Sequence, residues 1–559
     1  MNLRELLERA AERNGPQPAL RFKAGGHWET RSYAGLLGRA RRLAETLHAQ
    51  GIRPGDRVGL VRENAPDWPE LYFGIVGCGA VAVPMDPKLR AQEVAHILAD
   101  SGAVAAVIAP KNYPLFREIE ARQETLRHVW LLDAPAPPPA PSRRVRYASW
   151  TEAVEAVAEP APGCGVWERH PLRDADLASL IYTSGTTGRQ KGVMLSHGNF
   201  AANALACIEA IHIRSDDNFL LVLPLFHAFA FTANLLLPVG AGACISFVES
   251  IKTMGENMRE VSPTVLMAVP LLLDKLLLRI EGRVKENPLA RVLLALGVRG
   301  PVRRRVAQSL GGALRLVVSG GAPCDPEVLR GLRRFGLEAI EGYGLTEAAP
   351  VVSFNPPGAV RIGTVGRPLP GIELRILEPG AGGVGEIALR GPNVMAGYYR
   401  NPEAGAEVLR DGWLATGDLG FVDADGYLTI SGRKKALIVN REGKNIYPEE
   451  VEQQLHKSPY ILESLVLAYR DAGESVGEKV GAIVVPRQDA IDAHAAQQNR
   501  RFTERETDEF VRAEVQRVAR DIADYKRPRR VQIRSEELEK TSTGKVKRYL
   551  YQLDAGSGG

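Results

Sequence analysis

The stretch LIYTSGTTGRQKG, residues 180–192, is an apolar strand-like segment that runs directly into a loop of Ser, Thr and Gly ending in a lysine. Backbone N–H groups, hydroxyl groups and the ammonium of Lys191 would converge there on a polyphosphate. The stretch does not fit the Walker pattern G-x-x-x-x-G-K-[ST], because Gly192 follows Lys191. It therefore predicts a phosphate-binding loop of another kind. Taken alone, it leaves an exposed turn without function as the alternative.

On either side of this loop, the first two-thirds of the chain alternates apolar strand-like runs with helical patterns. The runs include residues 57–61, 80–84 and 103–109, with an apolar segment at 71–78 among them. This alternation is typical of sheets covered by helices, which is the α/β class. With 559 residues, the chain is long enough for several folding units.

The pattern of apolar and charged residues changes after Gly417. Residues 421–430 predict a hairpin with an Asp-Gly turn, and charged helix-forming segments follow from Pro448, with strand candidates at 464–469 and 480–485. We therefore expect two domains. These are a large multi-subdomain N-terminal α/β domain, residues 1–433, and a small α+β C-terminal domain, residues 434–559.

The composition narrows the class of protein. Hydrophobic residues make up 45% and charged residues 25%, and the net charge is +5, so the chain is neither disordered nor a general nucleic-acid binder. The five cysteines are odd in number, widely spaced and form no CxxC pair, which argues against a disulfide framework and a zinc site. The N-terminal residues 1–9 predict an amphipathic helix and not a signal peptide. We expect a cytoplasmic protein.

A long uncharged segment, residues 219–248, contains no Asp, Glu, Lys or Arg. Its prolines and glycines divide it into pieces too short to cross a bilayer. It predicts a buried strand, turn and helix around a pocket.

Five further motifs carry groups suited to nucleotide chemistry. Paired glycines let a ligand ring approach the backbone, an aromatic ring between glycines offers a stacking face, a glutamate offers a hard oxygen for Mg²⁺, and an aspartate can accept ribose hydroxyls. The motifs are SGGAP at 319–323, EGYGLTE at 341–347, WLATGD at 413–418, GRKK at 432–435 and KTSTGKVKR at 540–548.

In this order, the phosphate loop and these motifs resemble the adenylate-forming (AMP-binding) superfamily of acyl-CoA synthetases, nonribosomal peptide adenylation domains and luciferases. The resemblance covers about residues 3–551. Gln190 and Glu539 stand where the family often has proline, which affects loop rigidity and removes no catalytic group. The resemblance implies an acyl-CoA synthetase-like fold with a mobile C-terminal domain, and ATP, Mg²⁺ and coenzyme A as cofactors and substrates.

The resemblance also implies a role for each matching residue. The catalytic residues would be Lys545, His227, Thr186 and Glu347, with Glu347 also the Mg²⁺ ligand. The ATP-binding residues would be Thr183, Ser184, Gly185, Thr186, Thr187, Gly188, Lys191, Gly320, Gly321, Ala322, Pro323, Glu341, Gly342, Tyr343, Gly344, Thr346, Asp418 and Arg433. The other sites would be the hinge at Lys435, the acyl pocket at Phe226, His227 and Phe229, and the CoA site at Gly443 and Lys444.

The residues around the expected acyl pocket narrow the substrate. An amino acid substrate needs an acidic partner for its ammonium, and residues 219–248 contain none. Residues 249–275, 432–435 and 443–450 look most like bacterial long-chain fatty-acyl-CoA ligases. We therefore expect a fatty acid, ATP and CoA as the ligands and no nucleic acid.

Several alternatives stay open. One is transfer of the acyl group to a carrier-protein phosphopantetheine, and another is an acid that is aromatic or of medium chain length. The alternative from another class is a regulator that binds a nucleotide without turnover. The sequence does not decide between CoA and an acyl carrier protein as acceptor, and it does not give the oligomeric state or any peripheral membrane contact.

Overall fold

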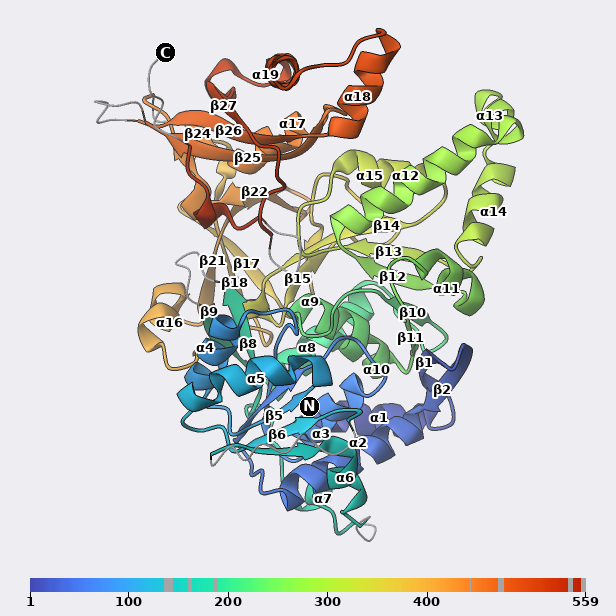
Figure 1. The fold of residues 1–559 in the computed structure, drawn as a ribbon, viewed down its shortest axis with the longest axis vertical. Coiled ribbons are helices and arrows are strands. Elements are labelled where there is room, and N and C mark those ends of the chain that lie inside the picture. Colours follow the sequence, from blue (N-terminus) through green and yellow to red (C-terminus); the bar gives the residue numbers. More distant parts are fainter. Residues whose placement is uncertain are drawn as a thin grey trace. The chain divides into compact units, whose positions relative to one another are not determined.

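The chain folds into two compact units (Figure 1). The computed structural model describes residues 1–134, 144–158, 163–184, 190–442, 444–470, 477–540 and 546–553. Unit 1 comprises Met1–Leu374 and Leu389–Leu414, and unit 2 comprises Arg375–Ala388 and Ala415–Gly559. The expected large α/β part and smaller second part are therefore confirmed. The two units are groups of residues that pack together. The boundary expected between residues 433 and 434 instead separates a C-terminal domain that moves from the rest of the chain. That boundary stays a prediction.

Sheet 1 of unit 1 has nine strands in the order β16-β15-β14-β13-β12-β10-β11-β1-β2. The strands from β1 through β11, β10, β12 and β13 to β14 pair in parallel, and β2, β15 and β16 pair antiparallel. Because parallel strands end at one edge, the segments after β10, β13 and β14 meet there. The strands are β1 (Pro18–Ala24), β2 (His27–Ser32), β10 (Asn218–Leu221), β11 (Cys244–Phe247), β12 (Val265–Ala268), β13 (Leu316–Ser319), β14 (Ala339–Gly344), β15 (Val351–Phe354) and β16 (Arg367–Pro368).

Sheet 2 of unit 1 has eight strands in the order β19-β9-β8-β4-β3-β5-β6-β7. It is parallel from β8 to β7, and β9 and β19 add an antiparallel edge. The strands are β3 (Arg57–Val61), β4 (Val81–Pro84), β5 (Ala105–Ile108), β6 (His128–Leu131), β7 (Arg146–Ser149), β8 (Leu177–Ser184), β9 (Gln190–Ser196) and β19 (Gly397–Tyr398).

Helices cover both sheets of unit 1. Alternate residues of β12 face different cores: Val265 lies in a core shared with sheet 2 and helices α1–α3, whereas Leu266 packs with the core beneath α11, α12, α14 and α15. The helices are α1 (Leu3–Asn14), α2 (Tyr33–Ala49), α3 (Trp68–Gly77), α4 (Ala91–Ser101), α5 (Tyr113–Ile119), α6 (Trp150–Glu155), α7 (Val166–Arg169), α8 (His197–Ala210), α9 (Ala228–Phe231), α10 (Leu237–Ala241), α11 (Met254–Val261), α12 (Pro270–Glu286), α13 (Pro288–Ala295), α14 (Gly300–Ser309), α15 (Pro326–Arg334) and α16 (Pro402–Val408).

Unit 2 has a core of its own around a three-stranded sheet, β25-β26-β27, whose first two strands confirm the expected strands at 464–469 and 480–485. β21 and β22 form the expected hairpin, with Gly426 at a φ of 83° in its turn. The elements that lie wholly or mostly in unit 2 are β18 (Gly385–Arg390), β21 (Trp413–Val422), β22 (Leu428–Arg433), β23 (Ile438–Val439), β24 (Asn445–Ile446), α17 (Pro448–Leu455), β25 (Ile461–Tyr469), β26 (Lys479–Pro486), α18 (Gln488–Gln497), α19 (Glu504–Val518) and β27 (Arg530–Ile533). The sheet of β18 and β21 also includes β17 (Glu373–Leu377) and β20 (Leu409–Arg410).

The uncharged segment 219–248 folds as expected into strand, turn and helix. It forms most of β10, then α9, a π-helical turn at Thr232–Leu236, α10 and β11, all within the core of unit 1. In the described part of the chain, we find no helix that combines the length and the apolar character needed to span a bilayer.

Candidate active site

The β8–β9 hairpin of sheet 2 positions Lys191. In the antiparallel register Thr183 lies opposite Lys191, and Tyr182 lies opposite Gly192. A Cβ at Gly192 would come within 3.0 Å of the Tyr182 ring, so glycine lets this ring lie across β9. The Tyr182 hydroxyl donates to Asp100 at 2.6 Å, and burial, followed by this carboxylate, raises the pKa of Tyr182. The strand that carries Lys191 is thereby held in place.

Part of the predicted phosphate loop is outside the structural description. Gly185, Thr186, Thr187 and Gly188 lie outside the described residues, as do Gly443 and Lys545. Ser184 ends β8, opposite Gln190. The roles of these residues stay predictions.

Tyr398 joins two predicted site residues that are far apart in sequence. Its hydroxyl donates to Glu347 Oε1 at 2.9 Å, and the Lys191 ammonium lies over its ring, 5.0 Å from the centroid. Burial raises the pKa of Tyr398, and the Glu347 carboxylate raises it further. The structure thus brings together the predicted phosphate-binding lysine and the predicted metal-binding glutamate. The sequence analysis missed Tyr398, although the Gly-Tyr pair at 397–398 could have marked it.

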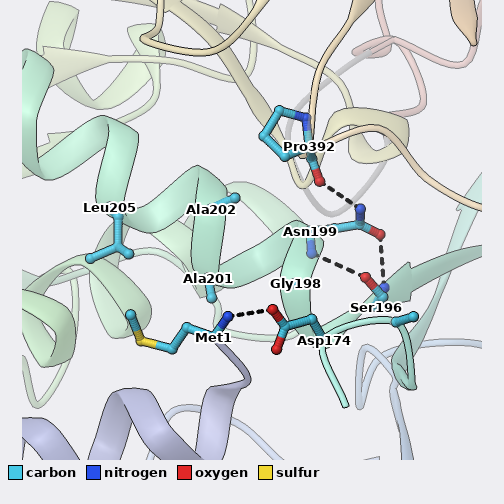
Figure 2. Close-up of a pocket in the computed structure, with 10 residues that line it drawn as sticks. Met1, Asp174, Ser196, Gly198, Asn199, Ala201, Ala202, Leu205 and Pro392 are labelled. Atoms are coloured by element: carbon cyan, nitrogen blue, oxygen red, sulfur yellow. Dashed lines mark hydrogen bonds and ion pairs between the residues drawn. The ribbon is translucent and has the colours of Figure 1, made fainter.

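The segment that carries Tyr398 is fixed by main-chain hydrogen bonds. β19 pairs with β9, and the Met395 N–H donates to the Glu347 carbonyl at 2.9 Å. Figure 2 shows Asn199 between Ser196 and Pro392: its amide donates to the Pro392 carbonyl at 2.8 Å, and its oxygen accepts from the Ser196 N–H. These groups lie around a cavity of about 460 Å³ at the start of α8, and its lining includes none of the predicted ATP or acyl residues. This cavity is therefore not the predicted ATP or acyl pocket.

The predicted acyl and nucleotide motifs meet at the carboxyl edge of sheet 1. A Cβ at Gly320, just after β13, would come within 2.6 Å of the Phe229 ring on α9, so only glycine allows this packing. The next residue, Gly321, has a φ of +83°, which favours glycine as well. Ala322 and Pro323 continue the loop, with Ala322 half-buried and Pro323 exposed. The acyl motif thus packs directly against the glycine pair.

Glu341 closes this loop from the neighbouring strand. It lies opposite Ser319 in the parallel register of β13 and β14, and its Oε1 accepts from the Cys324 N–H at 2.9 Å. The residue is 6% exposed, and burial raises the pKa of Glu341 to about 7, while the Cys324 hydrogen bond opposes that rise. A carboxyl group is therefore buried behind the glycine pair.

The raised pKa of Glu341 predicts a pH dependence of stability. The folded state binds this proton more tightly than the unfolded state, so the added stability is fully present below about pH 4.5 and is lost as the pH rises through about 7. Relative to wild type, Glu341→Gln should therefore gain about 3 kcal/mol between about pH 4 and pH 8 in the free energy of urea unfolding. The matched control is Glu327→Gln, because the Glu327 side chain is 71% exposed. Parallel profiles of Glu341→Gln and wild type would contradict this account.

The rest of the EGYGLTE motif, residues 342–347, completes this edge of sheet 1. A Cβ at Gly342 would come within 2.4 Å of the Phe354 ring, and one at Gly344 within 2.1 Å of the Pro350 carbonyl, so both glycines are required by close packing. Tyr343 is half-buried between them and packs against the main core. Thr346 begins the single helical turn that contains Glu347.

Asn64 fixes the loop that leads to the predicted acyl pocket. Its amide donates to the Leu223 carbonyl at 2.7 Å, and its oxygen accepts from the Leu225 N–H at 2.9 Å. The Phe226 and His227 rings follow, with centroids 4.5 Å apart, and His227 precedes the first turn of α9. Asn64 lies far away in sequence, and no local pattern marks it.

In unit 2, the structure pairs two predicted ATP-binding residues with each other. Asp418 and Arg433 lie opposite one another on β21 and β22, with Asp418 Oδ1 and Arg433 Nε 2.8 Å apart. The Asp418 side chain is only 5% exposed, whereas that of Arg433 is 52% exposed. The pair can therefore present a fixed carboxylate beside a solvent-facing cation.

Lys435, the predicted hinge residue, and Lys444, one of the predicted CoA residues, are exposed in unit 2. Lys435 lies in the single helical turn Lys434–Ala436 that follows β22. Lys444 forms an ion pair with Glu442 at 2.7 Å, and its ammonium lies over the Tyr525 ring at 4.7 Å.

Unit 1 offers one carboxylate, that of Glu347, at the predicted Mg²⁺ site. Within the described ranges, there is no cluster of three or more His, Cys, Asp or Glu side chains suited to a metal ion. Mg²⁺ in phosphate chemistry commonly uses one or two carboxylates together with substrate phosphates and waters. The single carboxylate of Glu347, held by Tyr398 close to Lys191, fits this kind of site.

Comparison with known proteins agrees with this arrangement. Residues 7–399 match the AMP-binding enzyme family, and residues 450–545 match the AMP-binding enzyme C-terminal domain. A long-chain-fatty-acid–CoA ligase of Mycobacterium bovis is 33% identical over 481 residues, covering 81% of this chain and 77% of the relative. Indoleacetate–CoA ligase of Aromatoleum aromaticum is 31% identical over 561 residues, covering 98% and 97%. The solved structure of ATP-bound MatB from Rhodopseudomonas palustris is 28% identical with a TM-score of 0.77, covering 98% of both chains.

Proposed function

The chain belongs to the AMP-binding enzyme family and is an AMP-forming acid–CoA ligase, and we propose that its acid is a long-chain fatty acid. The reaction has two steps. A carboxylate oxygen attacks the α-phosphorus of ATP and pyrophosphate leaves, which gives an acyl adenylate. The thiol of CoA then loses its proton and attacks the acyl carbon, and AMP leaves.

One observation supports a fatty acid as the substrate. The acyl motif packs on the nucleotide motif through Phe229 and Gly320, and the segment 219–248 that supplies Phe229 contains no charged side chain. A buried ammonium would have no acidic partner in this segment, whereas an alkyl chain needs none. The relative from Mycobacterium bovis is named for the same class of acid, and the relative from Aromatoleum aromaticum for an aromatic one.

Lys191 and Glu347, which both contact Tyr398, suit the first step. Attack by a carboxylate on a phosphate brings like charges together, so positive charge must stabilise the transition state. Lys191 would bind the phosphates, and Glu347, held by Tyr398, would hold Mg²⁺. Mg²⁺, when bound, would neutralise phosphate charge. We assign Lys545 to the attacking oxygen and His227 to the mouth of the acyl pocket.

The C-terminal domain would serve the second step. We assign the hinge to Lys435, the CoA site to Gly443 and Lys444, and the moving body to residues 434–559. Asp418 would bind the ribose hydroxyls beside Arg433. Transfer to a carrier-protein phosphopantetheine instead of CoA is the alternative for this step, and an assay with either acceptor separates the two.

The dependence of kcat/KM on chain length tests the proposed acid. An apolar pocket gains about 0.8 kcal/mol for each methylene that it buries, so kcat/KM with CoA should rise about three- to fourfold per carbon until the pocket is filled. A saturated acid of about a dozen carbons or more should exceed acetate, benzoate and all α-amino acids. A flat profile, or a maximum at an aromatic acid, would reject the long-chain assignment and leave the acid–CoA ligase intact.

A further inference from the structure

Helices α12, α13 and α14 of unit 1 form a projecting group, in which α13 follows α12 at their outer end (Figure 1). The inner face of α12 is buried through Leu273, Leu277 and Ile280, which pack on the core beneath sheet 1. The residues on the opposite face therefore point away from that core.

Large apolar side chains gather on this outer face. In the described part of the chain, thirteen such side chains are exposed, and six of them lie within residues 271–298. We call these six the α12–α13 surface: Leu271, Leu278, Leu289, Val292, Leu296 and Val298.

The α13 helix places its apolar residues on one stripe. Leu289, Val292 and Leu296 follow an i, i+3, i+7 spacing and are 66%, 54% and 71% exposed, so they share one solvent-facing side. On α12, Leu271 and Leu278 are likewise seven residues apart and more than half exposed. Apolar stripes of this kind on a soluble protein usually mark a contact surface.

Basic residues outnumber acidic ones on α12, α13 and α14. Residues 270–309 contain nine Lys or Arg and three Asp or Glu, a net charge of +6 in a chain whose total is +5. Lys275 and Arg279 share the outer face of α12, and Arg291 is exposed on α13. Within the ranges that the structure describes, these three side chains have no ion-pair partner. Helices α12, α13 and α14 together therefore carry as much excess positive charge as the whole chain.

We propose that the α12–α13 surface docks onto the surface of an anionic lipid bilayer. Leu289, Val292 and Leu296 would enter the boundary between head groups and acyl chains, and the neighbouring Lys and Arg side chains would lie among the anionic head groups. An apolar stripe flanked by basic residues is typical of helices that lie in a membrane interface. The proposal does not depend on which acid the enzyme activates.

Vesicle co-sedimentation of the full-length protein, without substrates, tests this docking. Binding to vesicles with about one third phosphatidylglycerol should exceed binding to pure phosphatidylcholine vesicles by about tenfold or more, and about 0.5 M NaCl should remove most of the difference. The triple variant Leu289→Ser/Val292→Ser/Leu296→Ser should bind the anionic vesicles about tenfold more weakly. Its adenylation activity and far-ultraviolet circular dichroism should match wild type, because these side chains are exposed.

Two matched controls separate docking from general effects. Ile251→Ser removes an apolar side chain that is 58% exposed outside this surface and should leave vesicle binding unchanged. Lys275→Gln/Arg291→Gln should weaken anionic binding, whereas Arg501→Gln/Arg520→Gln, which removes the same charge from exposed positions of unit 2, should not. Equal binding to both kinds of vesicle would overturn the proposal, as would unchanged binding of the triple variant. Self-association that the triple variant abolishes, without vesicle binding, would instead assign the surface to contacts between copies.

Discussion

Lys545→Ala should lower the rate of adenylation by about 10²- to 10³-fold and leave thioester formation from supplied acyl-AMP within about threefold of wild type. The reason is electrostatic. In the first step an anionic carboxylate approaches an anionic phosphate, and the ammonium of Lys545 is the group that we assign to the attacking oxygen. In the second step this repulsion between two anions is absent, because the carboxylate has already reacted and pyrophosphate has left. Acid-dependent pyrophosphate release measures the first step, and acyl-CoA formation from synthetic acyl-AMP measures the second.

Lys547→Ala is the matched control for this experiment. Lys547 lies two residues further along the chain, and its ammonium is 3.8 Å from the Glu539 carboxylate, so a partner already neutralises its charge. Its loss should leave both half-reactions near wild type. Equal losses of both half-reactions in Lys545→Ala would reject the division of labour between the two steps. Full adenylation activity in that variant would reject the assignment of Lys545.

Much of the fold follows from local patterns in the sequence. The strand-like run at 57–61 is β3, and the Asp-Gly turn joins β21 to β22. The uncharged segment 219–248 forms the strand, turn and helices that its prolines and glycines predict. These features were predictable because hydrophobic periodicity and turn residues act over a few neighbouring positions.

The parts of the candidate site that escaped prediction depend on long-range packing. Tyr398 contacts Glu347 and Lys191 only because β19 pairs with β9. Asn64, which follows β3 of sheet 2, donates to the carbonyl of Leu223, which follows β10 of sheet 1. The exposed apolar stripe of α13 was not predicted either. Hydrophobic periodicity predicts that a helix has an apolar face, but it does not tell whether a neighbouring element covers that face. The sequence motifs therefore identify the reacting groups better than the residues that position them.

Glu347→Gln should lower adenylation by about 10²- to 10³-fold and raise the Mg²⁺ concentration needed for half-maximal rate. The change removes the negative charge of the one carboxylate that Tyr398 holds beside Lys191 and keeps its shape. Pyrophosphate release titrated with Mg²⁺ at saturating ATP gives both quantities. Adenylation at the wild-type rate with unchanged Mg²⁺ dependence would reject Glu347 as the metal ligand.

Tyr398→Phe isolates the positioning role in the same titration. It removes only the hydroxyl that donates to Glu347 Oε1 at 2.9 Å and keeps the ring beneath the Lys191 ammonium. We expect the half-maximal Mg²⁺ concentration to rise about 10- to 100-fold, with a smaller effect on the rate at saturating Mg²⁺. The matched control is Tyr399→Phe, because the Tyr399 ring lies against Arg400 instead. In the double variant Tyr398→Phe/Glu347→Gln the loss should be no larger than that of Glu347→Gln alone, since the hydroxyl acts through the carboxylate. Additive losses would mean that Tyr398 contributes independently of Glu347.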